Sequence, residues 1–331
     1  MLASCLGLLV TAACGTSGSS ESSTPGALDG GTTPTTVLAA TTTSTTEAPS
    51  TTTTVGRTPA SGVLRTTSGV LVPLRAQLVD GSGWVVGTPC GGEAVVATGV
   101  PVPALQVVVD PGHGGSESGS VSGAGLWESR LNLDVSLRVE QVLRAQGVSV
   151  ELTRRDDRQV TLASRAELAR SLTPQVLVSV HHNGGHLGAS DVPGTLVFHQ
   201  VDAPASRRLA GLVNEELVAA FTPLGLQWVA GIAPGALAVR NEQGTDYYGV
   251  LRGAAGVPSV IVEALYLTGP DEAAALERDD VRQAEAEAIG RAVVRFLTTR
   301  GSGSGFRSEL TFGAGAVPTR EPGGCIDPSL G

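Results

Sequence analysis

The chain has 331 residues, of which 41% are hydrophobic and only 3% aromatic, so its core must consist mainly of Val, Leu and Ala. Its formal net charge is −9, and all 22 Lys-plus-Arg positions are arginine. Such an acidic chain, without a basic cluster, excludes nucleic acid as a partner and electrostatic attachment to an anionic membrane or wall. If the protein stays at a cell envelope, we expect a covalent anchor to hold it there.

An apolar, small-residue segment opens the chain and ends directly before Cys14. It is too short to span a membrane and has the composition of a secretory signal. Small residues just before a cysteine resemble a bacterial lipobox, so we predict a lipoprotein-type signal at 1–14 with Cys14 as the lipidated residue. The alternative is an ordinary cleaved signal. We therefore predict an exported protein, either secreted or lipid-anchored to the outer side of the cytoplasmic membrane at the cell envelope.

Residues 15–60 are dominated by Thr, Ser, Gly, Pro and Ala. This composition cannot bury a core and predicts a disordered tether that lets a folded domain reach away from its anchor. Residues 61–100 contain short apolar runs separated by Gly and Pro, at 69–78, 83–90 and 93–99, and predict a small β subdomain. Cys90 and Cys325 form the pair that remains outside the signal, and in an exported chain we expect a disulfide that ties the tail at 301–331 back.

From residue 105 the pattern alternates between strands and helices. The alternation predicts an α/β fold: a twisted, mixed, mostly parallel sheet with helices on both faces, preceded by the small β subdomain. The predicted strands are 106–110, 148–154, 175–180, 195–201 and 257–265. The predicted helices are 130–146, 161–172, 205–221 and 284–297, with Thr161 as the N-cap of the second. We predict a loop at 226–252.

Histidines and acids lie where the predicted strands end. His113 follows the first strand and His181 the third, while Glu263 lies near the end of the last. Ligands of open α/β sheets bind outside the carboxyl ends of the strands. Glu128 begins a predicted helix, where the helix dipole favours a carboxylate. Two His and one Glu make a suitable open zinc site, with a fourth position left for water.

Six motifs occur in order along the chain: VVVDPGHGG, GLWES, LTRRDDR, ASRAELA, SVHHN and PSVIVEALYLT. Together they resemble the zinc-dependent N-acetylmuramoyl-L-alanine amidases of the peptidoglycan amidase type 3 family. The resemblance covers about 105–298. It implies a zinc amidase catalytic domain, which we place at 101–300.

The resemblance also implies the roles of four residues. His113, Glu128 and His181 would bind one Zn²⁺ per chain, and Glu263 would be the catalytic carboxylate, acting as general base and acid toward zinc-activated water. The implied reaction cleaves the amide bond between N-acetylmuramic acid and L-alanine. The implied substrate is peptidoglycan or a muropeptide, and we expect a monomer.

The motifs place other residues around this set. Between the neighbours His181 and His182, the motif selects His181, so we predict that His182 lies at the rim and faces substrate or solvent. Asp110 either orients a ligating imidazole or only terminates its strand. Gly114 and Gly115 are expected to keep bulk away from the metal.

The remaining positions have less motif support. We expect His186 and His199 at the surface or in packing, and Arg154 and Arg165 as structural ion-pair partners. The substrate-facing wall is predicted in the loop at 226–252, with Trp228, Arg240, Asn241, Tyr247 and Tyr248.

Two alternatives accompany the amidase hypothesis. The first is a catalytically silent peptidoglycan-binding regulator, which would be expected to have lost at least one of the four site residues. The second is a zinc peptidase that cuts within the stem peptide. A phosphate loop is excluded, because the GHGG stretch lacks the P-loop pattern and the chain has no lysine.

Overall fold

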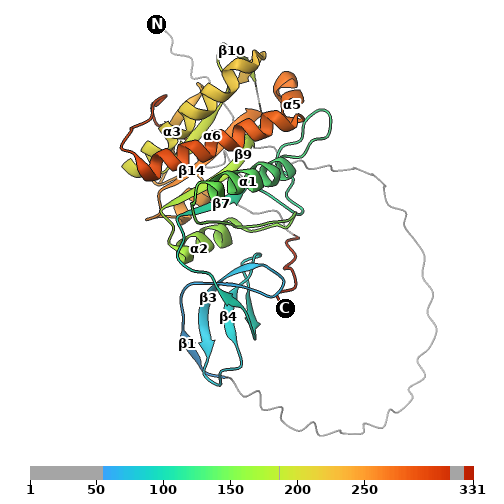
Figure 1. Cartoon of the computed structure of the whole chain (residues 1–331), viewed down its shortest axis with the longest axis vertical. Coiled ribbons are helices and arrows are strands. Elements are labelled where there is room, and N and C mark those ends of the chain that lie inside the picture. Colours follow the sequence, from blue (N-terminus) through green and yellow to red (C-terminus); the bar gives the residue numbers. More distant parts are fainter. Residues whose placement is uncertain (1–54, 186, 314–323) are drawn as a thin grey trace, which may run out of the picture.

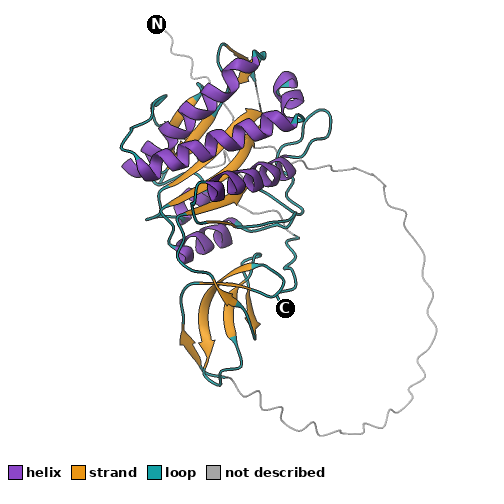
Figure 2. Ribbon diagram, in the orientation of Figure 1, coloured by secondary structure: helices purple, strands orange, loops and turns teal. Residues whose placement is uncertain are grey.

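The computed structural model describes residues 55–185, 187–313 and 324–331. In it, a part built of strands alone precedes a larger part in which strands and helices alternate (Figures 1 and 2). Cys14 and His186 lie outside the described residues, as does most of the predicted tether. Among the described residues, no helix is both long enough and apolar enough to cross a bilayer.

The first part, here called the β subdomain, is an antiparallel sheet that includes the three predicted strand regions. Its core is small and includes Leu64, Val72 and Val86. The strand nearest its N-terminal end overlaps the region predicted as tether, because residues 57–59 pair with residues 76–78. The tether prediction was therefore wrong at its C-terminal end. The strands are β1 (Arg57–Pro59), β2 (Val63–Arg65), β3 (Leu71–Leu78), β4 (Trp84–Gly87), β5 (Glu93–Val96) and β6 (Val100–Pro101).

The C-terminal tail returns to this subdomain, as the cysteine pair predicted. Cys90 and Cys325 are joined by a disulfide, with their Cα atoms 5.7 Å apart. The backbone N–H of Cys90 also donates to a carboxylate oxygen of Asp327 at 2.8 Å. Leu330 packs against the small core of the subdomain. The end of the chain therefore packs on the β subdomain, and the disulfide joins two cysteines that are 235 positions apart in the sequence.

The larger part is organised around one sheet with the strand order β15-β13-β11-β14-β9-β7-β8. All neighbouring pairs in this sheet are parallel except β11 with β14, so the predicted mixed, mostly parallel sheet is confirmed. Its strands are β7 (Val107–Pro111), β8 (Val150–Leu152), β9 (Val176–Asn183), β11 (Leu196–His199), β13 (Gly235–Arg240), β14 (Ser259–Tyr266) and β15 (Leu310–Thr311). A separate short pair is formed by β10 (Gly188–Ser190) and β12 (Trp228–Ala230).

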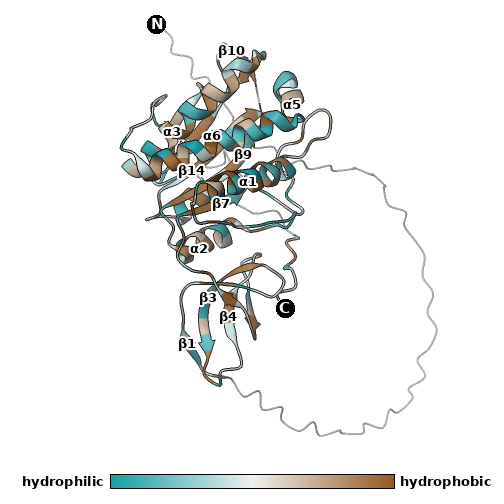
Figure 3. Cartoon of the chain, in the orientation of Figure 1, coloured by the Kyte–Doolittle hydropathy of each residue, from teal (hydrophilic) through white to brown (hydrophobic). Residues whose placement is uncertain are grey.

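Helices cover both faces of the sheet. The face under α1 (Glu128–Ala145), α3 (Pro204–Phe221) and α6 (Asp279–Thr298) receives Val107 and Val109 of β7, and Val108 between them packs on the opposite face with α2 (Leu162–Leu172) and α4 (Gly249–Gly253). Alternate residues of a strand point to opposite faces, so both layers of the core can draw on one apolar strand. Hydropathy follows this arrangement, with mainly brown strands and helices that carry both teal and brown residues (Figure 3). Two further helical segments are α5 (Pro270–Leu276) and the short 3-10 turn Thr222–Leu224.

Most elements lie where the sequence predicted them, and Thr161 caps α2 by accepting from the backbone N–H of Ser164. The prediction of a loop at 226–252 was wrong. That segment contains β12, β13 and α4, and β13 is a parallel strand of the main sheet. Helix α6 also begins five residues before the predicted 284, at Asp279.

Candidate metal centre

Three side chains are delivered to one point by a strand end, a helix start and a strand. His113 follows β7 by two residues, Glu128 is the first residue of α1, and His181 lies within β9. Because β7 and β9 are adjacent and parallel, both reach the same edge of the sheet. One ligand atom from each of the three residues lies within 4.8 Å of the others.

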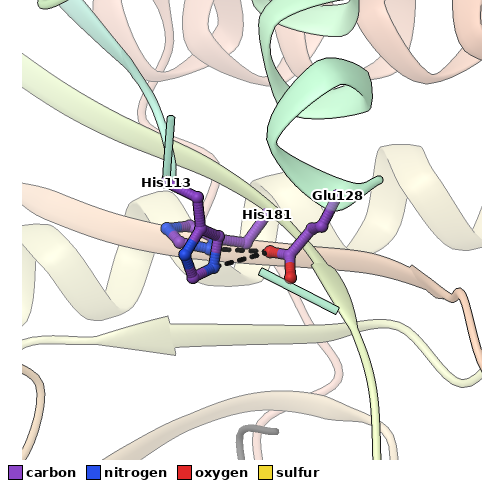
Figure 4. Close-up of side chains that lie close together, drawn as sticks. All are labelled: His113, Glu128 and His181. Atoms are coloured by element: carbon purple, nitrogen blue, oxygen red, sulfur yellow. Dashed lines mark hydrogen bonds and ion pairs between the residues drawn. The ribbon is translucent and has the colours of Figure 1, made fainter. Parts of the chain in front are cut away.

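The carboxylate of Glu128 is the centre of this cluster. Its Oε1 lies 3.1 Å from Nε2 of His113 and 3.0 Å from Nδ1 of His181 (Figure 4). The two imidazole rings meet edge to face, with ring centroids 4.9 Å apart. The other carboxylate oxygen, Oε2, accepts from the backbone N–H of Ser120 at 2.8 Å. Glu128 is buried, whereas the two histidine side chains keep 21% and 18% of their exposure, so the cluster is reachable from solvent.

His113 adopts a left-handed backbone conformation with φ of 58°. A non-glycine residue rarely adopts this conformation unless its surroundings hold it there. Two buried arginines do so: Arg165 donates to the carbonyl oxygens of Pro111 and His113, and Arg154 donates to those of Pro111 and Gly112. The predicted role of these arginines as ion-pair partners fits Arg165, which pairs with Asp110, whereas the guanidinium of Arg154 donates to backbone carbonyl oxygens.

Asp110 does not contact an imidazole of the cluster. Its carboxylate pairs with Arg165 at 2.6 Å and accepts hydrogen bonds from the hydroxyls of Thr153 and Ser179. Burial would raise the pKa of this carboxyl, but the Arg165 guanidinium and the hydroxyl donors outweigh burial and lower it. Asp110 therefore fixes Arg165, which in turn fixes the loop that carries His113.

Two glycines border the cluster, and they are not the two that the sequence indicated. A Cβ atom on Gly112 would lie 2.2 Å from Nε2 of His181, and one on Gly119 would lie 2.5 Å from Oε2 of Glu128. By contrast, Gly114 and Gly115 lie against the backbone of residues 158 and 159, so the expectation that they clear space for a metal was wrong. The imidazole of His181 can occupy its place only because residue 112 has no side chain.

Glu263 lies on the strand next to His181. In the parallel pair of β14 with β9, Glu263 is in register with His181. Ile261, two residues before Glu263, packs in the core on the α2 side of the sheet. Because alternate residues of a strand share a face, Glu263 points to that side as well. His181 does the same, since Leu177 on its strand also packs in the α2-side core. Burial and the nearby charge of Glu128 raise the pKa of Glu263 well above its ordinary value. The side chain is nevertheless partly exposed.

The carboxylates around His113 favour its protonated form. Burial opposes the charged form of His113, but the carboxylates of Glu128 and Glu117 raise its pKa to about 10. Burial would raise the pKa of Glu128, but His113 and His181 hold it well below its ordinary value. Among the described residues, Nδ1 of His113 makes no well-oriented hydrogen bond, although Oε1 of Glu117 is 3.1 Å away. A divalent ion that binds two nitrogens and one carboxylate would displace this proton, and this donor set suits zinc.

The rim position predicted for His182 is wrong. The residue is 1% exposed and points to the opposite face of β9, where it contacts Asn132 of α1 and Glu285 of α6. Of the two placements expected for His199, at the surface or in packing, the structure shows the second, since the residue is buried. Of the side chains expected in a substrate wall, Trp228 is buried, Arg240 pairs with Asp202 and Glu309, and Tyr248 stacks on Phe198.

Sequence reasoning missed four residues near the cluster: Glu117, Gly119, Asn132 and Glu285. Asn132 had a local signal, since it lies one helical turn after Glu128 and therefore on the same side of α1. Glu285 also had one, because it interrupts an apolar helical stripe formed by Val281, Ile289 and Ala292. Its partner, however, lies 103 residues away in the sequence.

Comparison with known proteins gives this geometry a family. The profile of the N-acetylmuramoyl-L-alanine amidase family matches residues 107–295, a range that includes His113, Glu128, His181 and Glu263. The uncharacterized protein YqiI of Bacillus subtilis is 31% identical over 191 residues, 57% of this chain and 83% of YqiI. N-acetylmuramoyl-L-alanine amidase AmiA of Escherichia coli is 27% identical over 220 residues, 58% of this chain and 75% of AmiA.

The fold agrees with a solved relative. The crystal structure of N-acetylmuramoyl-L-alanine amidase from Clostridium difficile 630 superposes with a TM-score of 0.51 at 28% identity and covers 60% of this chain and 100% of that one. The family profile alone spans more than half of the present chain. The chain therefore belongs to the N-acetylmuramoyl-L-alanine amidase family and is a cell-wall hydrolase that cleaves an amide bond of peptidoglycan.

Proposed function

We propose that this amidase depends on one zinc ion held by His113, Glu128 and His181, and that Glu263 moves the proton during hydrolysis. The proposed bond joins the lactyl group of N-acetylmuramic acid to L-alanine of the stem peptide. One observation carries the proposal: two imidazole nitrogens and one carboxylate converge within 4.8 Å, and Glu263 lies in register beside His181.

The convergent donors suit zinc in number and type. Three protein ligands of nitrogen and oxygen are typical of catalytic zinc sites, which keep a further position for water or substrate. When bound, zinc supplies Lewis acidity, which polarises a carbonyl and lowers the pKa of water. The exposure that remains on His113 and His181 leaves room for a substrate to approach.

Glu263 has the environment of a group that exchanges protons. Its raised pKa brings proton uptake closer to neutral pH than that of an ordinary carboxyl. In the proposed reaction its carboxylate takes a proton from the attacking water and delivers it to the amide nitrogen as the C–N bond breaks. The products are the free carboxylic acid of the muramyl lactyl group and the amine of L-alanine, so atoms and protons balance.

As a cell-wall hydrolase, the protein is an exported or envelope protein. We propose further that a lipid on Cys14 anchors it and that residues beyond the anchor tether the enzyme. We also propose a monomer as the working unit, since one chain supplies all four candidate residues. Release of the Cys14→Ser variant from the membrane tests the lipid anchor. Light scattering of the purified protein tests the monomer.

The decisive experiment digests peptidoglycan with the purified protein and identifies the fragments by mass. We expect intact stem peptides, loss of their release with a chelator, and recovery on adding zinc. Glu263→Gln should lower the rate by about 10²- to 10⁴-fold while zinc remains bound. The matched control is Glu272→Gln, a buried carboxylate that accepts from the backbone N–H groups of Val229 and Tyr266, and which should lower stability but keep the rate of the folded protein.

Other outcomes would contradict specific parts. Peptides cut internally would identify a zinc peptidase and move the scissile bond. No release by a folded, zinc-loaded protein would indicate the silent wall-binding alternative. Full activity after complete metal removal would overturn the zinc site itself.

A further inference from the structure

Behind the metal cluster, on the other face of β9, lies a second polar group that the amidase reaction does not use. It consists of Asn132 on α1, His182 on β9 and Glu285 on α6. Asn132 and Glu285 are 0% exposed and His182 is 1% exposed. His182 follows Val176, Val178 and Val180 on this face, so the group sits at the end of the apolar layer beneath α1 and α6.

The hydrogen bonds of Asn132 connect this group to the cluster. Its Nδ2 donates to Oε1 of Glu128 at 3.3 Å and to the carbonyl oxygen of Gly112 at 3.2 Å. One amide group therefore holds both the expected carboxylate ligand and the backbone next to His113. The backbone N–H of His182 donates to the same Oε1 of Glu128 at 3.3 Å.

This use of Asn132 determines the orientation of its amide. Because the Nδ2 group donates to two acceptors, Oδ1 must face Nδ1 of His182, which is 2.8 Å away. Nδ1 must then carry a proton, since an amide oxygen cannot donate. On the far side of the ring, Nε2 of His182 lies 3.2 Å from Oε2 of Glu285. Glu285 thus holds the ring in the orientation that presents its Nδ1–H to Asn132.

Packing alone does not account for the pair of His182 and Glu285. A buried histidine–carboxylate pair stabilises a fold little more than apolar side chains of similar volume, because desolvation offsets the attraction. The surroundings are apolar, with Val135, Ala286 and Ile289 in the same core layer. The pair also leaves Oε1 of Glu285 without a hydrogen-bond partner among the described residues. Its benefit therefore lies in orienting its neighbours.

We propose that Asn132 is a positioning residue for Glu128, and that His182 and Glu285 hold Asn132 in the required orientation. The inference rests on the proposed function, because Glu128 must be a zinc ligand for its orientation to matter. Hydrogen-bonded partners behind metal ligands orient the ligands, and their removal typically weakens metal binding by about 10- to 100-fold. The expected readout is therefore zinc affinity, which is measured without any turnover.

The test compares four forms of the full chain by zinc competition with a chelator. His182→Leu/Glu285→Leu removes both ends of the pair, leaves no buried charge unpaired, and deprives Oδ1 of Asn132 of its donor. His182→Asn/Glu285→Leu replaces the ring by an amide whose Nδ2 can take the place of Nδ1–H. The control is Ser136→Ala, one turn after Asn132 on α1, where the buried hydroxyl makes no hydrogen bond among the described residues.

We expect the zinc Kd of the Leu/Leu form to rise by about 10- to 100-fold. The Asn/Leu form should stay within about threefold of the wild type, although both double substitutions disturb the same core, and Ser136→Ala should match the wild type. A purely structural role would instead shift the thermal unfolding of both double forms and leave zinc affinity equal in all. If the Leu/Leu form does not fold, Asn132→Ala removes only the amide and should show the same weakening.

Two failures remain distinguishable. If the wild type itself does not bind one zinc per chain, the proposed function fails. If the wild type binds zinc and the folded Leu/Leu form or Asn132→Ala binds it equally well, the positioning role is overturned and the zinc site stands.

Discussion

Different interactions stabilise the rim of the large sheet and the β subdomain. At the rim, charged groups are buried and paired: Asp110 and Arg165 are 1% and 3% exposed. In the β subdomain, the ion pairs are more exposed, ranging from Arg57 with Glu93 at 54% and 45% to Arg65 with Glu151 at 33% and 14%. The subdomain relies instead on a small apolar core and on the disulfide of Cys90 with Cys325.

The difference teaches where this chain tolerates buried polarity. Buried charges are costly unless they are paired and hydrogen-bonded. At the rim they hold the backbone carbonyls of residues 111–113, in the loop that carries His113 to the candidate metal centre. The β subdomain orients no such cluster, and a covalent link compensates for the little surface that a small core can bury.

Opening the disulfide is expected to have the largest effect on stability. Cys90→Ser/Cys325→Ser releases a closed loop with a sequence separation of 235. In the chain-entropy model such a loss amounts to about 5.5 kcal/mol of unfolding free energy. Urea unfolding of the oxidised wild type and the double variant measures it.

Zinc affinity is the control for this comparison. The four site residues make no contact with the disulfide, so the double variant should bind zinc as the wild type does. A large loss of zinc affinity would show that the two regions are coupled and would break the distinction drawn between them.

Breaking the buried pair at the rim is expected to cost about 3–5 kcal/mol. Asp110→Asn keeps the size of the side chain but leaves the guanidinium of Arg165 without its carboxylate. Because Arg165 also holds the loop of His113, zinc affinity should fall together with stability. Urea unfolding and zinc competition measure the two effects.

The pH dependence supplies an independent check on this pair. The pKa of Asp110 is lowered in the folded protein. The ionised carboxylate therefore contributes to the free energy of unfolding in full above the pKa of the unfolded state, about 3.9. This contribution is lost as pH falls through the lower, folded value. The stability difference between wild type and Asp110→Asn should therefore shrink below about pH 4. A difference that stays constant down to pH 2 would contradict the role given to the ionised carboxylate.

A surface pair should have the smallest effect. Nη2 of Arg138 lies 2.6 Å from Oδ1 of Asp279, whose side chain is 75% exposed. Asp279→Asn should change the unfolding free energy by only about 0–1 kcal/mol, since solvent screens the pair. A loss comparable to that of Asp110→Asn, measured in the same urea titration, would remove the contrast between buried and surface charges.

Much of the site could be predicted because its signals are local. A valine-rich run followed by Asp-Pro-Gly-His places His113 after a buried strand, and Glu128 begins an amphipathic helix. Parallel strands bring their carboxyl ends to one edge, so these residues could be expected near His181 and Glu263. The cysteine pair likewise required only an exported chain and two remaining cysteines.

Other features depended on partners distant in the sequence. The segment that forms β13 was predicted as part of a loop, and its strand character comes from pairing with β11 and with the tail strand β15. The clearance that Gly112 gives to His181 was not predicted, because the need for a bare Cα arises from a ring that lies 69 positions later in the sequence.

The sequence by itself determined the family motifs, the alternation of strands and helices, and the set of His113, Glu128, His181 and Glu263, because each rests on local pattern and order. Only the tertiary structure decided that His182 is buried. Strand alternation predicts that neighbouring histidines face opposite ways, but it does not tell what covers each face. That answer required α1 and α6 to be packed in place, with Asn132 and Glu285 meeting the ring from two helices.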